Sequence, residues 1–231
     1  LLNFAHGELI TVSGYAAYAA FTQGWSWFVV APLVVVVSIV AALAIERIAF
    51  SRVRGASDFT LLLTSFGIHF LVSAVFLMYV GARVKTFPSP SWINDTVSVG
   101  PLNIEIFDLV VIGVTIVTLA ATVAILQKTM FGLALRAAAA DFDTARMMGV
   151  DSNRVIRGAF ALSGLLAGIA AIFWIMRAGN TSPTAGVDPM LKGVLAALIG
   201  GLGSLRGAVL GGLALGVAEV QDAMPVPNWV P

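Results

Sequence analysis

Near its start the chain carries a run of polar residues, Asn3-Phe-Ala-His-Gly-Glu8, immediately before a long apolar segment. The run combines an amide, an imidazole and a carboxylate, and ionisable groups inside a membrane usually line a solute path or pair with each other. Helix capping is the other interpretation, because a helix dipole favours Glu8 at its N-terminus while Asn3 and His6 can cap free N–H groups. We favour capping and keep a role in a solute pathway as the alternative.

The residue types available elsewhere exclude most catalytic and metal sites. The chain has no cysteine, which rules out disulfides, thiolate zinc sites and cysteine nucleophiles. It contains no His-Glu-x-x-His motif, and no serine–histidine–acid grouping or carboxylate pair stands out as a catalytic set. His69 stands alone in an apolar stretch, where we expect it to form an interhelical hydrogen bond. The sequence therefore predicts neither an enzyme nor a bound cofactor or metal.

A glycine-rich run, Gly200-Gly-Leu-Gly-Ser-Leu-Arg-Gly207, superficially resembles a phosphate-binding loop. It lacks the Gly-Lys-Ser/Thr ending, and no strand precedes it, so we reject nucleotide binding. We expect instead a half-helix at Met190–Ile199, a break at Gly200–Gly207 and a short helix at Ala208–Val220. The alternative is one long kinked helix.

Such a break is relevant to function because lipid cannot form hydrogen bonds with backbone N–H and C=O groups. Backbone that is not helical is therefore found within the membrane only where it is buried in protein or lines a cavity. Broken helices are also a recurrent feature of translocation paths. The predicted candidates for a solute pathway or helix break are therefore Asn3, His6, Glu8, Gly200, Gly201 and Gly203.

Composition shows what must position these residues. Of the 231 residues, 59% are hydrophobic and only 11% are charged, and the mean hydropathy is +0.97. Soluble domains have about 45–50% apolar and about 25% charged residues, so a soluble globular protein is excluded. The net charge of +1 offers no field to attract nucleic acid. The chain is predicted to be a membrane protein whose surroundings are the lipid bilayer.

Charged residues divide the chain into apolar runs that can be compared with the length of about 20 residues that a membrane helix needs. The run 9–45 is long enough for two spans separated by the polar turn Gln23-Gly24-Trp25. The runs 59–82, 109–127 and 158–176 each supply one more. With the C-terminal helices, we expect an all-α, polytopic transmembrane helix bundle of about six spans that forms a single domain over residues 1–231.

The distribution of lysine and arginine predicts the orientation, because cytoplasmic loops are rich in these residues. With alternate loops assigned to one side, nine of the 13 basic residues fall on the side of loops 49–57 and 127–157, and four on the other. The first side is therefore predicted to be cytoplasmic. The segment 81–105, with three prolines and an alternating stretch at Thr96–Val99, should form an external flap or hairpin.

The loop 127–157 holds eight of the 25 charged residues, yet its middle is rich in strong helix formers. We expect a short helix over Asp141–Met148, ended by Gly149. Phe142, Ala145 and Met148 follow at a spacing of three residues and form one apolar face of this helix. From the pattern alone, the helix packs on its own membrane domain or lies among lipid headgroups.

Several segments together resemble the permeases of branched-chain amino-acid ABC transporters, and the LivH-type subunit in particular. The segments that carry the resemblance are Leu2-Asn-Phe-Ala-His-Gly-Glu8 with Gly14-Tyr15; Ile45-Glu-Arg47 with Arg52 and Arg54; Arg136-Ala-Ala-Ala-Ala-Asp141 with Ala145, Met148-Gly149 and Arg154-Val155; and Gly200-Gly-Leu-Gly-Ser204 with Gly207-Ala208, Gly211-Gly212 and Gly216–Glu219. They occur in the order expected for the family and span nearly the whole chain. The family's first and last membrane helices have no counterpart here, so the resemblance implies a fragment of a longer chain.

The resemblance implies a permease subunit of an ATP-driven importer in the bacterial inner membrane. Its partners would be a second permease subunit in a homo- or heterodimer, two ABC ATPase subunits and a periplasmic solute-binding protein. The ATPase-docking residues would be Arg136, Asp141, Phe142, Ala145, Met148 and Gly149. Branched-chain amino acids are the expected substrates. A urea- or amide-type permease of the same family and a stand-alone channel or secondary transporter remain the alternatives.

Overall fold

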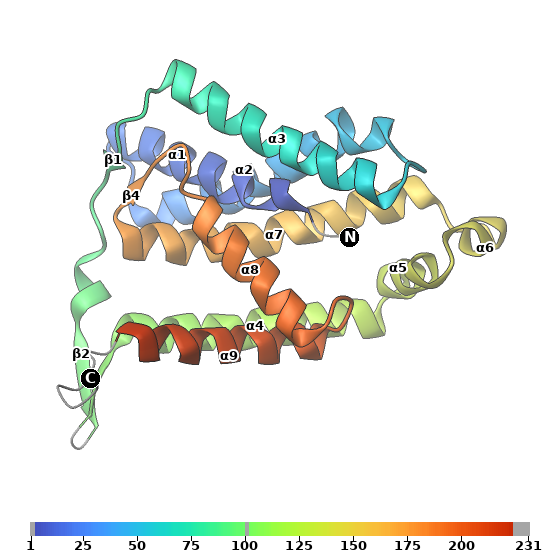
Figure 1. Cartoon of the computed structure of the whole chain (residues 1–231). Helices are drawn as coiled ribbons and strands as arrows, with labels where there is room; N and C mark the ends of the chain where they lie inside the picture. The colour runs from blue at the N-terminus through green and yellow to red at the C-terminus, as the bar shows by residue number, and fades with distance from the viewer. Residues whose placement is uncertain (1–2, 100–101, 224–231) are drawn as a thin grey trace, which may run out of the picture.

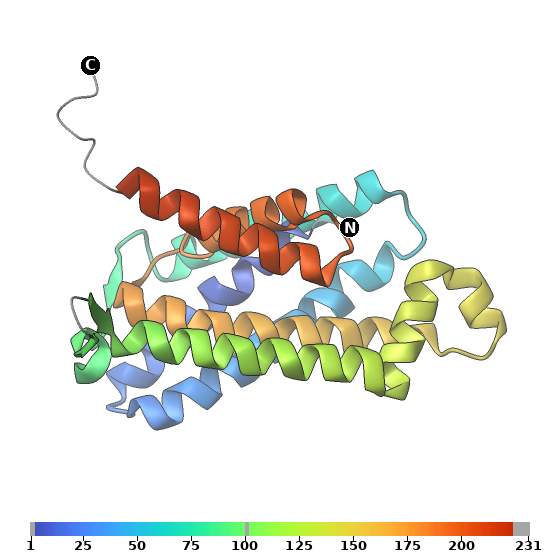
Figure 2. The same cartoon turned by 90° about the horizontal axis from the view of Figure 1, so that it is seen from below.

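The computed structural model describes residues 3–99 and 102–223, and these form mostly long helices (Figures 1 and 2). The α-helices are α1 (Glu8–Thr22), α2 (Trp27–Ile48), α3 (Asp58–Tyr79), α4 (Ile106–Lys128), α5 (Met130–Ala140), α6 (Phe142–Met147), α7 (Ser152–Ala178), α8 (Val187–Gly200) and α9 (Leu205–Ala223). Single-turn 3₁₀ helices lie at Phe4–His6, Phe50–Arg52 and Ser91–Asn94. The all-α class predicted from the sequence is confirmed.

Two small antiparallel sheets lie at one end of the bundle, on the left in Figure 1. Strands β2 (Thr96–Val99) and β3 (Leu102–Glu105) form the hairpin predicted in the segment 81–105. Strand β1 (Lys85–Thr86) pairs with β4 (Asn180–Thr181), which follows α7. This end of the bundle is called the β end below.

Within the described residues, four helices, α2, α3, α4 and α7, are long and apolar enough to cross a membrane, and the bent pair α8–α9 would make a fifth crossing. The sequence predicted about six spans, and the difference lies in α1. This helix begins and ends close to where we expected, but its 15 residues are fewer than the about 20 that a full crossing needs.

The predicted break in the C-terminal segment is confirmed. The axes of α8 and α9 differ by 119°, which excludes one long kinked helix. Gly201 and Gly203 have φ values of +87° and +89°, in the left-handed region that glycine occupies without a steric penalty. The two helices then pack closely, with Gly207 against Gly200 and Gly211 against Ala196.

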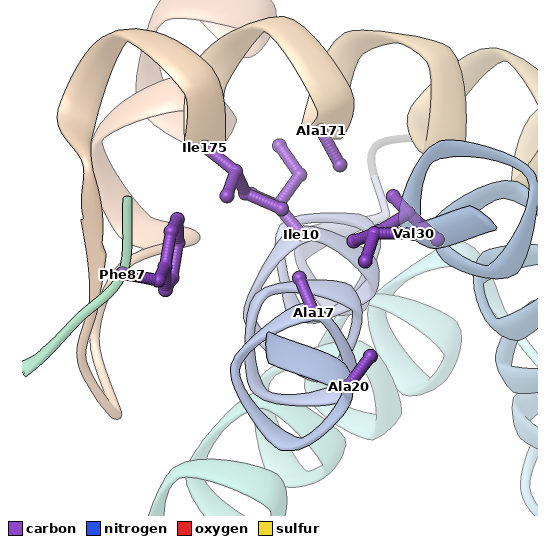
Figure 3. Packing of buried hydrophobic residues seen from close by; sticks show 8 residues of the cluster. Ile10, Ala17, Ala20, Val30, Phe87, Ala171 and Ile175 are labelled. Carbon is purple, nitrogen blue, oxygen red and sulfur yellow. The ribbon is translucent and has the colours of Figure 1, made fainter. Parts of the chain in front are cut away.

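The core lies where α1, α2 and α7 meet. Figure 3 shows Ile10 and Ala17 of α1 facing Val30 of α2 and Ile175 of α7, all of which are buried. Two glycines of α7, Gly164 and Gly168, bring the backbones of α2 and α7 together. A Cβ on Gly164 or Gly168 of α7 would meet main-chain atoms of α2 at about 3 Å. Ser38 of α2 donates a hydrogen bond to Gly164 O at 2.7 Å across this interface.

The loops occupy the two ends as the charge distribution predicts. Helices α5 and α6 project together beyond the bundle at the end opposite the sheets (Figures 1 and 2). The loop 49–57 lies at the same end, because Arg54 Nη1 bonds Asn153 Oδ1 at the start of α7. This end is called the α6 end, and the segment 81–105 lies at the β end.

Candidate functional site

The N-terminal ends of α1 and α8 meet inside the bundle. Gly7 and Gly186 approach so closely that a Cβ on either residue would overlap backbone atoms of the other. Thr11 Oγ1 accepts a hydrogen bond from Gly186 N at 3.0 Å, and Ser73 Oγ donates one to Pro183 O at 3.3 Å. The segment 179–186, which is not helical, is therefore held against α1 and α3 by side chains, as backbone away from both water and lipid must be.

Glu8, the first residue of α1, lies beside this junction with no exposed surface. Its Oε1 is 2.5 Å from His69 Nδ1 and accepts a longer hydrogen bond from Ser73 Oγ at 3.5 Å. His69 is the twelfth of the 22 residues of α3, so the pair lies about halfway along a membrane helix. The predicted interhelical hydrogen bond of His69 is confirmed, and its partner is Glu8.

Three buried polar atoms near this junction have no hydrogen-bond partner among the described residues: Glu8 Oε2, Tyr15 Oη and Thr181 Oγ1. Thr181 lies against Gly14, and the ring of Tyr15 stacks on Phe76 of α3 with the centroids 4.2 Å apart. An unsatisfied buried group costs about 1–3 kcal/mol, and all three belong to α1 or to β4, which packs against it.

Asn3 and His6 behave differently from each other. Asn3 Oδ1 accepts a hydrogen bond from Ala5 N at 3.1 Å, which is the predicted capping role. The described contact of His6 is with the Ser163 hydroxyl of α7, at 3.1 Å from Nδ1, so this side chain links the N-terminal turn to α7. Asn3, His6 and Glu8 thus each contact a different part of the chain.

The structure does not bring the two groups of predicted pathway residues together. Glu8 lies beside the start of α8, whereas Gly200, Gly201 and Gly203 lie at or just beyond its end, 14 residues further along the helix. Gly201 and Gly203 have open space at the position of a Cβ. Their local role is to form the turn between α8 and α9.

The loop expected to dock an ATPase forms two helices rather than one. Asp141 caps α6 through a hydrogen bond from Thr144 N to Oδ1 at 3.0 Å, and Gly149 ends the segment with a φ of +88°. Val150 N bonds Ala145 O and Gly149 N bonds Arg146 O, the pattern of a Schellman cap. The helix α5, which carries Arg136, was not separately expected from the sequence.

The three residues of the expected apolar face differ widely in exposure, so they do not form one surface. Ala145 is 6% exposed and packs within the chain, Phe142 is 42% exposed, and Met148 is 82% exposed. Met147, which the three-residue spacing left out, is more exposed than any of these three, at 86%. The apolar surface that this end offers to a partner is therefore centred on the two methionines.

Comparison with known proteins identifies the family. The model of the family described as the permease component of the branched-chain amino acid transport system matches residues 1–230. The chain belongs to this family. The resemblance found in the sequence is thereby confirmed, and the family is one of transport permease components rather than of enzymes.

Individual relatives agree with the family model. The permease is 28% identical to the high-affinity branched-chain amino acid transport system permease protein BraD of Pseudomonas aeruginosa, over 96% of this chain and 76% of BraD. It is 29% identical, with the same coverage, to the corresponding protein LivH of Salmonella typhimurium. The fructose import permease protein FrcC of Rhizobium meliloti is 33% identical over only 40% of this chain and 28% of its own length. No solved structure matches the chain.

Two large cavities flank the permease bundle. The first, of about 800 Å³, lies between α4 and α7 and is almost wholly apolar, apart from three threonines of α4 and the Asp108–Arg177 ion pair at the β end. The second, of about 810 Å³, lies at the α6 end and is called the α6 cavity. Its lining consists of Asn3, Phe50, Arg54, Gly55, Asp58, Leu61, Ala138, Ala139, Phe142, Ile156, Ala159, Phe160 and Ser163.

An ion pair that was not predicted from the sequence lies beside the α6 cavity. It joins Glu46 to Arg54, which is part of the cavity lining. Glu46 is 2% exposed in the last turn of α2, and Arg54 bonds both its Oε1 and Asn153 Oδ1. A buried carboxylate near a helix C-terminus is opposed by the helix dipole and therefore needs a cationic partner, and this signal was available in the sequence. Thr11 and Ser73 were also missed, although they follow Glu8 and His69 at helical spacing.

Proposed function

We propose that this permease is the membrane-spanning subunit of an ATP-driven importer of amino acids, with branched-chain amino acids as its substrates, in the bacterial inner membrane. The relatives BraD and LivH, which are named for this transport, support the substrate. The nine-to-four distribution of basic residues supports the α6 end as the cytoplasmic end. The β end then faces outward, where a periplasmic solute-binding protein would deliver the solute.

The observation that carries the proposal is the helical pair α5–α6. It projects beyond the bundle at the α6 end and presents Met147 and Met148 to solvent, although exposed methionines on a short helix are a poor surface for an isolated chain (Figure 1). An ATPase subunit that covers them would bury this surface. We therefore assign docking to the segment of Arg136, Asp141 and Phe142–Gly149, with the methionines at its centre and Ala145 as internal support.

The assembly proposed is two permease subunits, alike or different, with two ATPase subunits. Long apolar helices at the edge of the bundle support a second permease subunit, because only 6% of the most apolar window of α4 is buried within this chain. A stand-alone channel or secondary transporter has no use for an exposed docking segment, so that alternative is less consistent with α5–α6.

The proposed solute path passes the junction of α1, α3 and α8. Glu8, His69 and Ser73 would supply polar contacts there, beside the backbone 179–186, and broken helices at such a position are typical of transporters. The glycine turn at Gly200, Gly201 and Gly203 would allow α8 and α9 to move against each other.

Co-purification and transport together test the proposal. The full-length permease, expressed with the products of the neighbouring genes, should retain ATPase subunits, and proteoliposomes of the complex should accumulate leucine, isoleucine or valine only with ATP and the binding protein. Uptake of urea in place of leucine would reassign the substrate. Uptake without any ATPase would favour the stand-alone carrier.

A further inference from the structure

We propose that the α6 cavity is a second binding site for an apolar α-amino acid, which fills from the cytoplasm and reports the concentration of imported solute to the ATPase-docking segment. This inference rests on the proposed function, because the ligand is the transported solute and the α6 end is taken as cytoplasmic. It is separate from the proposed solute path at Glu8.

The size and the walls of the α6 cavity fit a small amphiphilic ligand. Its volume of about 810 Å³ lies within the range of about 300–1,000 Å³ that small-molecule sites occupy. Most of the wall is apolar: Phe50 is buried, and Phe160 stacks obliquely on it with the ring centroids 5.4 Å apart. Leu61 and Ile156 extend this surface. A branched aliphatic side chain would be removed from water on such a wall.

The charged groups of the lining match the two charges of an α-amino acid. Arg54 can bind a carboxylate, because its guanidinium carries five N–H donors and the contacts with Glu46 and Asn153 use only two of them. Those contacts also hold the guanidinium in place. Asp58, in the first turn of α3, forms no ion pair with any residue that the structure describes and can bind an ammonium group.

The cavity is also built to sense its contents, because part of its wall belongs to the docking segment. Ala138 and Ala139 come from α5 and Phe142 comes from α6, whereas the rest of the wall comes from the N-terminal turn, the loop 49–57, α3 and α7. A ligand in the cavity would connect α5–α6 to the bundle and restrict its movement. Since the proposed function makes that segment the contact with the ATPase, occupancy should slow ATP turnover when cytoplasmic solute is high.

Direct binding is the first test, and it needs no ATP and no transport. Radiolabelled leucine should bind the purified permease–ATPase complex in the absence of the periplasmic binding protein. Ala139→Trp, which fills the cavity from α5, should abolish this binding. The matched control Ala137→Trp, at an exposed position of the same helix outside the lining, should bind leucine as the wild type does. Equal binding by wild type and Ala139→Trp, or no binding at all, would overturn the proposal.

A panel of ligands then tests the assigned chemistry. Leucine should displace the label, whereas 4-methylpentanoate, which lacks the ammonium group, and isoamylamine, which lacks the carboxylate, should each be weaker by a factor on the order of ten or more. In Asp58→Asn the affinity for leucine should fall by a similar factor while that for 4-methylpentanoate is unchanged. Equal affinity of all three compounds would contradict the roles of Arg54 and Asp58.

The regulatory step has its own readout in nanodiscs. With saturating leucine-loaded binding protein, added free leucine should lower ATP hydrolysis several-fold in the wild type and leave Ala139→Trp unaffected. Failure of the inference and failure of the proposed function are distinguishable. A complex that imports leucine but neither binds it here nor slows with it refutes only the feedback site. A complex that lacks ATPase subunits and imports nothing refutes the proposed function.

Discussion

Removal of His69 should be one of the most damaging single changes in the membrane region. In His69→Leu the Glu8 carboxylate, which has no exposed surface, loses its 2.5 Å contact with His69 and keeps the 3.5 Å hydrogen bond from Ser73. If the pair is ionised, the change leaves a buried charge without its partner, and such changes cost roughly 3–5 kcal/mol. If both groups are neutral, only an interhelical hydrogen bond is lost, which averages about 0.6 kcal/mol in membrane proteins. The loss of stability expected in the first case is therefore several times that expected in the second.

We expect the larger value, because Glu8 begins α1 and the N-terminus of α8 lies beside it, so two helix dipoles favour a negative charge at this place. A loss of 3–5 kcal/mol corresponds to a fall in unfolding temperature of roughly 6–20 °C for a chain of this size. This fall is measured by comparing the unfolding temperatures of the purified wild type and His69→Leu in the same detergent.

The control and a double variant complete this experiment. Phe70→Leu changes the next residue of α3, which is 66% exposed, and should shift the unfolding temperature by no more than a few degrees. Glu8→Gln combined with His69→Leu should recover part of the loss, because no charge is then left buried. If His69→Leu alone unfolds within about 2 °C of the wild type, the pair is not ionised and the electrostatic account of the junction is wrong.

Three further outcomes are expected. Gly186→Ala should prevent α1 and α8 from meeting, since its Cβ would overlap Gly7, and should reduce both the yield of folded permease and uptake, whereas Gly193→Ala, with open space at the Cβ position, should leave both intact. An impermeant maleimide added to intact spheroplasts should label Ser91→Cys but not Ala140→Cys, and the opposite pattern would reverse the assigned orientation. Met147→Ser with Met148→Ser should release the ATPase, because burial of each side chain is worth about 1.5–3 kcal/mol, while Met130→Ser, at a methionine 80% exposed at the start of α5, should retain it. Quantitative blotting of the co-purified ATPase decides the last of these.

The helices were predictable because charge interrupts apolar sequence at their ends. Charged residues mark both limits of α3, α4 and α7 and the end of α2 to within a few residues, since burial of a charge in lipid is far costlier than any local preference of the backbone. The start of α2 is marked instead by the polar turn Gln23-Gly24-Trp25. The turn at Gly201 and Gly203 was predictable for a similar reason, because two short apolar runs flank a cluster of glycines. The failure at α1 is also physical: the run 9–45 has the length of two spans, but the polar turn at Gln23-Gly24-Trp25 divides it unequally and leaves α1 with only 15 residues.

The contacts between distant segments were not predictable in the same way. Nothing local in Glu8 indicates a partner 61 residues away on α3, and nothing in Thr11 indicates Gly186, 175 residues away. The docking segment shows the limit most clearly. The three-residue spacing of Phe142, Ala145 and Met148 correctly indicated a helix, but which of its side chains are covered depends on how the surrounding chain folds, and Ala145 is buried while Met147 stays exposed.

The two ends of α8 explain how a signal from the α6 end could reach the junction at Glu8. Helix α8 contacts α9 extensively along its length, and its start is anchored to α1 through Gly186, Gly7 and Thr11. Its far end is the glycine turn. A Cβ built on Gly201 or Gly203 would have no heavy atom within 4 Å. Because Gly200 packs on Gly207 and Ala196 on Gly211, α8 would move together with α9 about its anchored start. Movement of α9 would therefore act on the contacts around Glu8 rather than on the core of α1, α2 and α7, which stays intact.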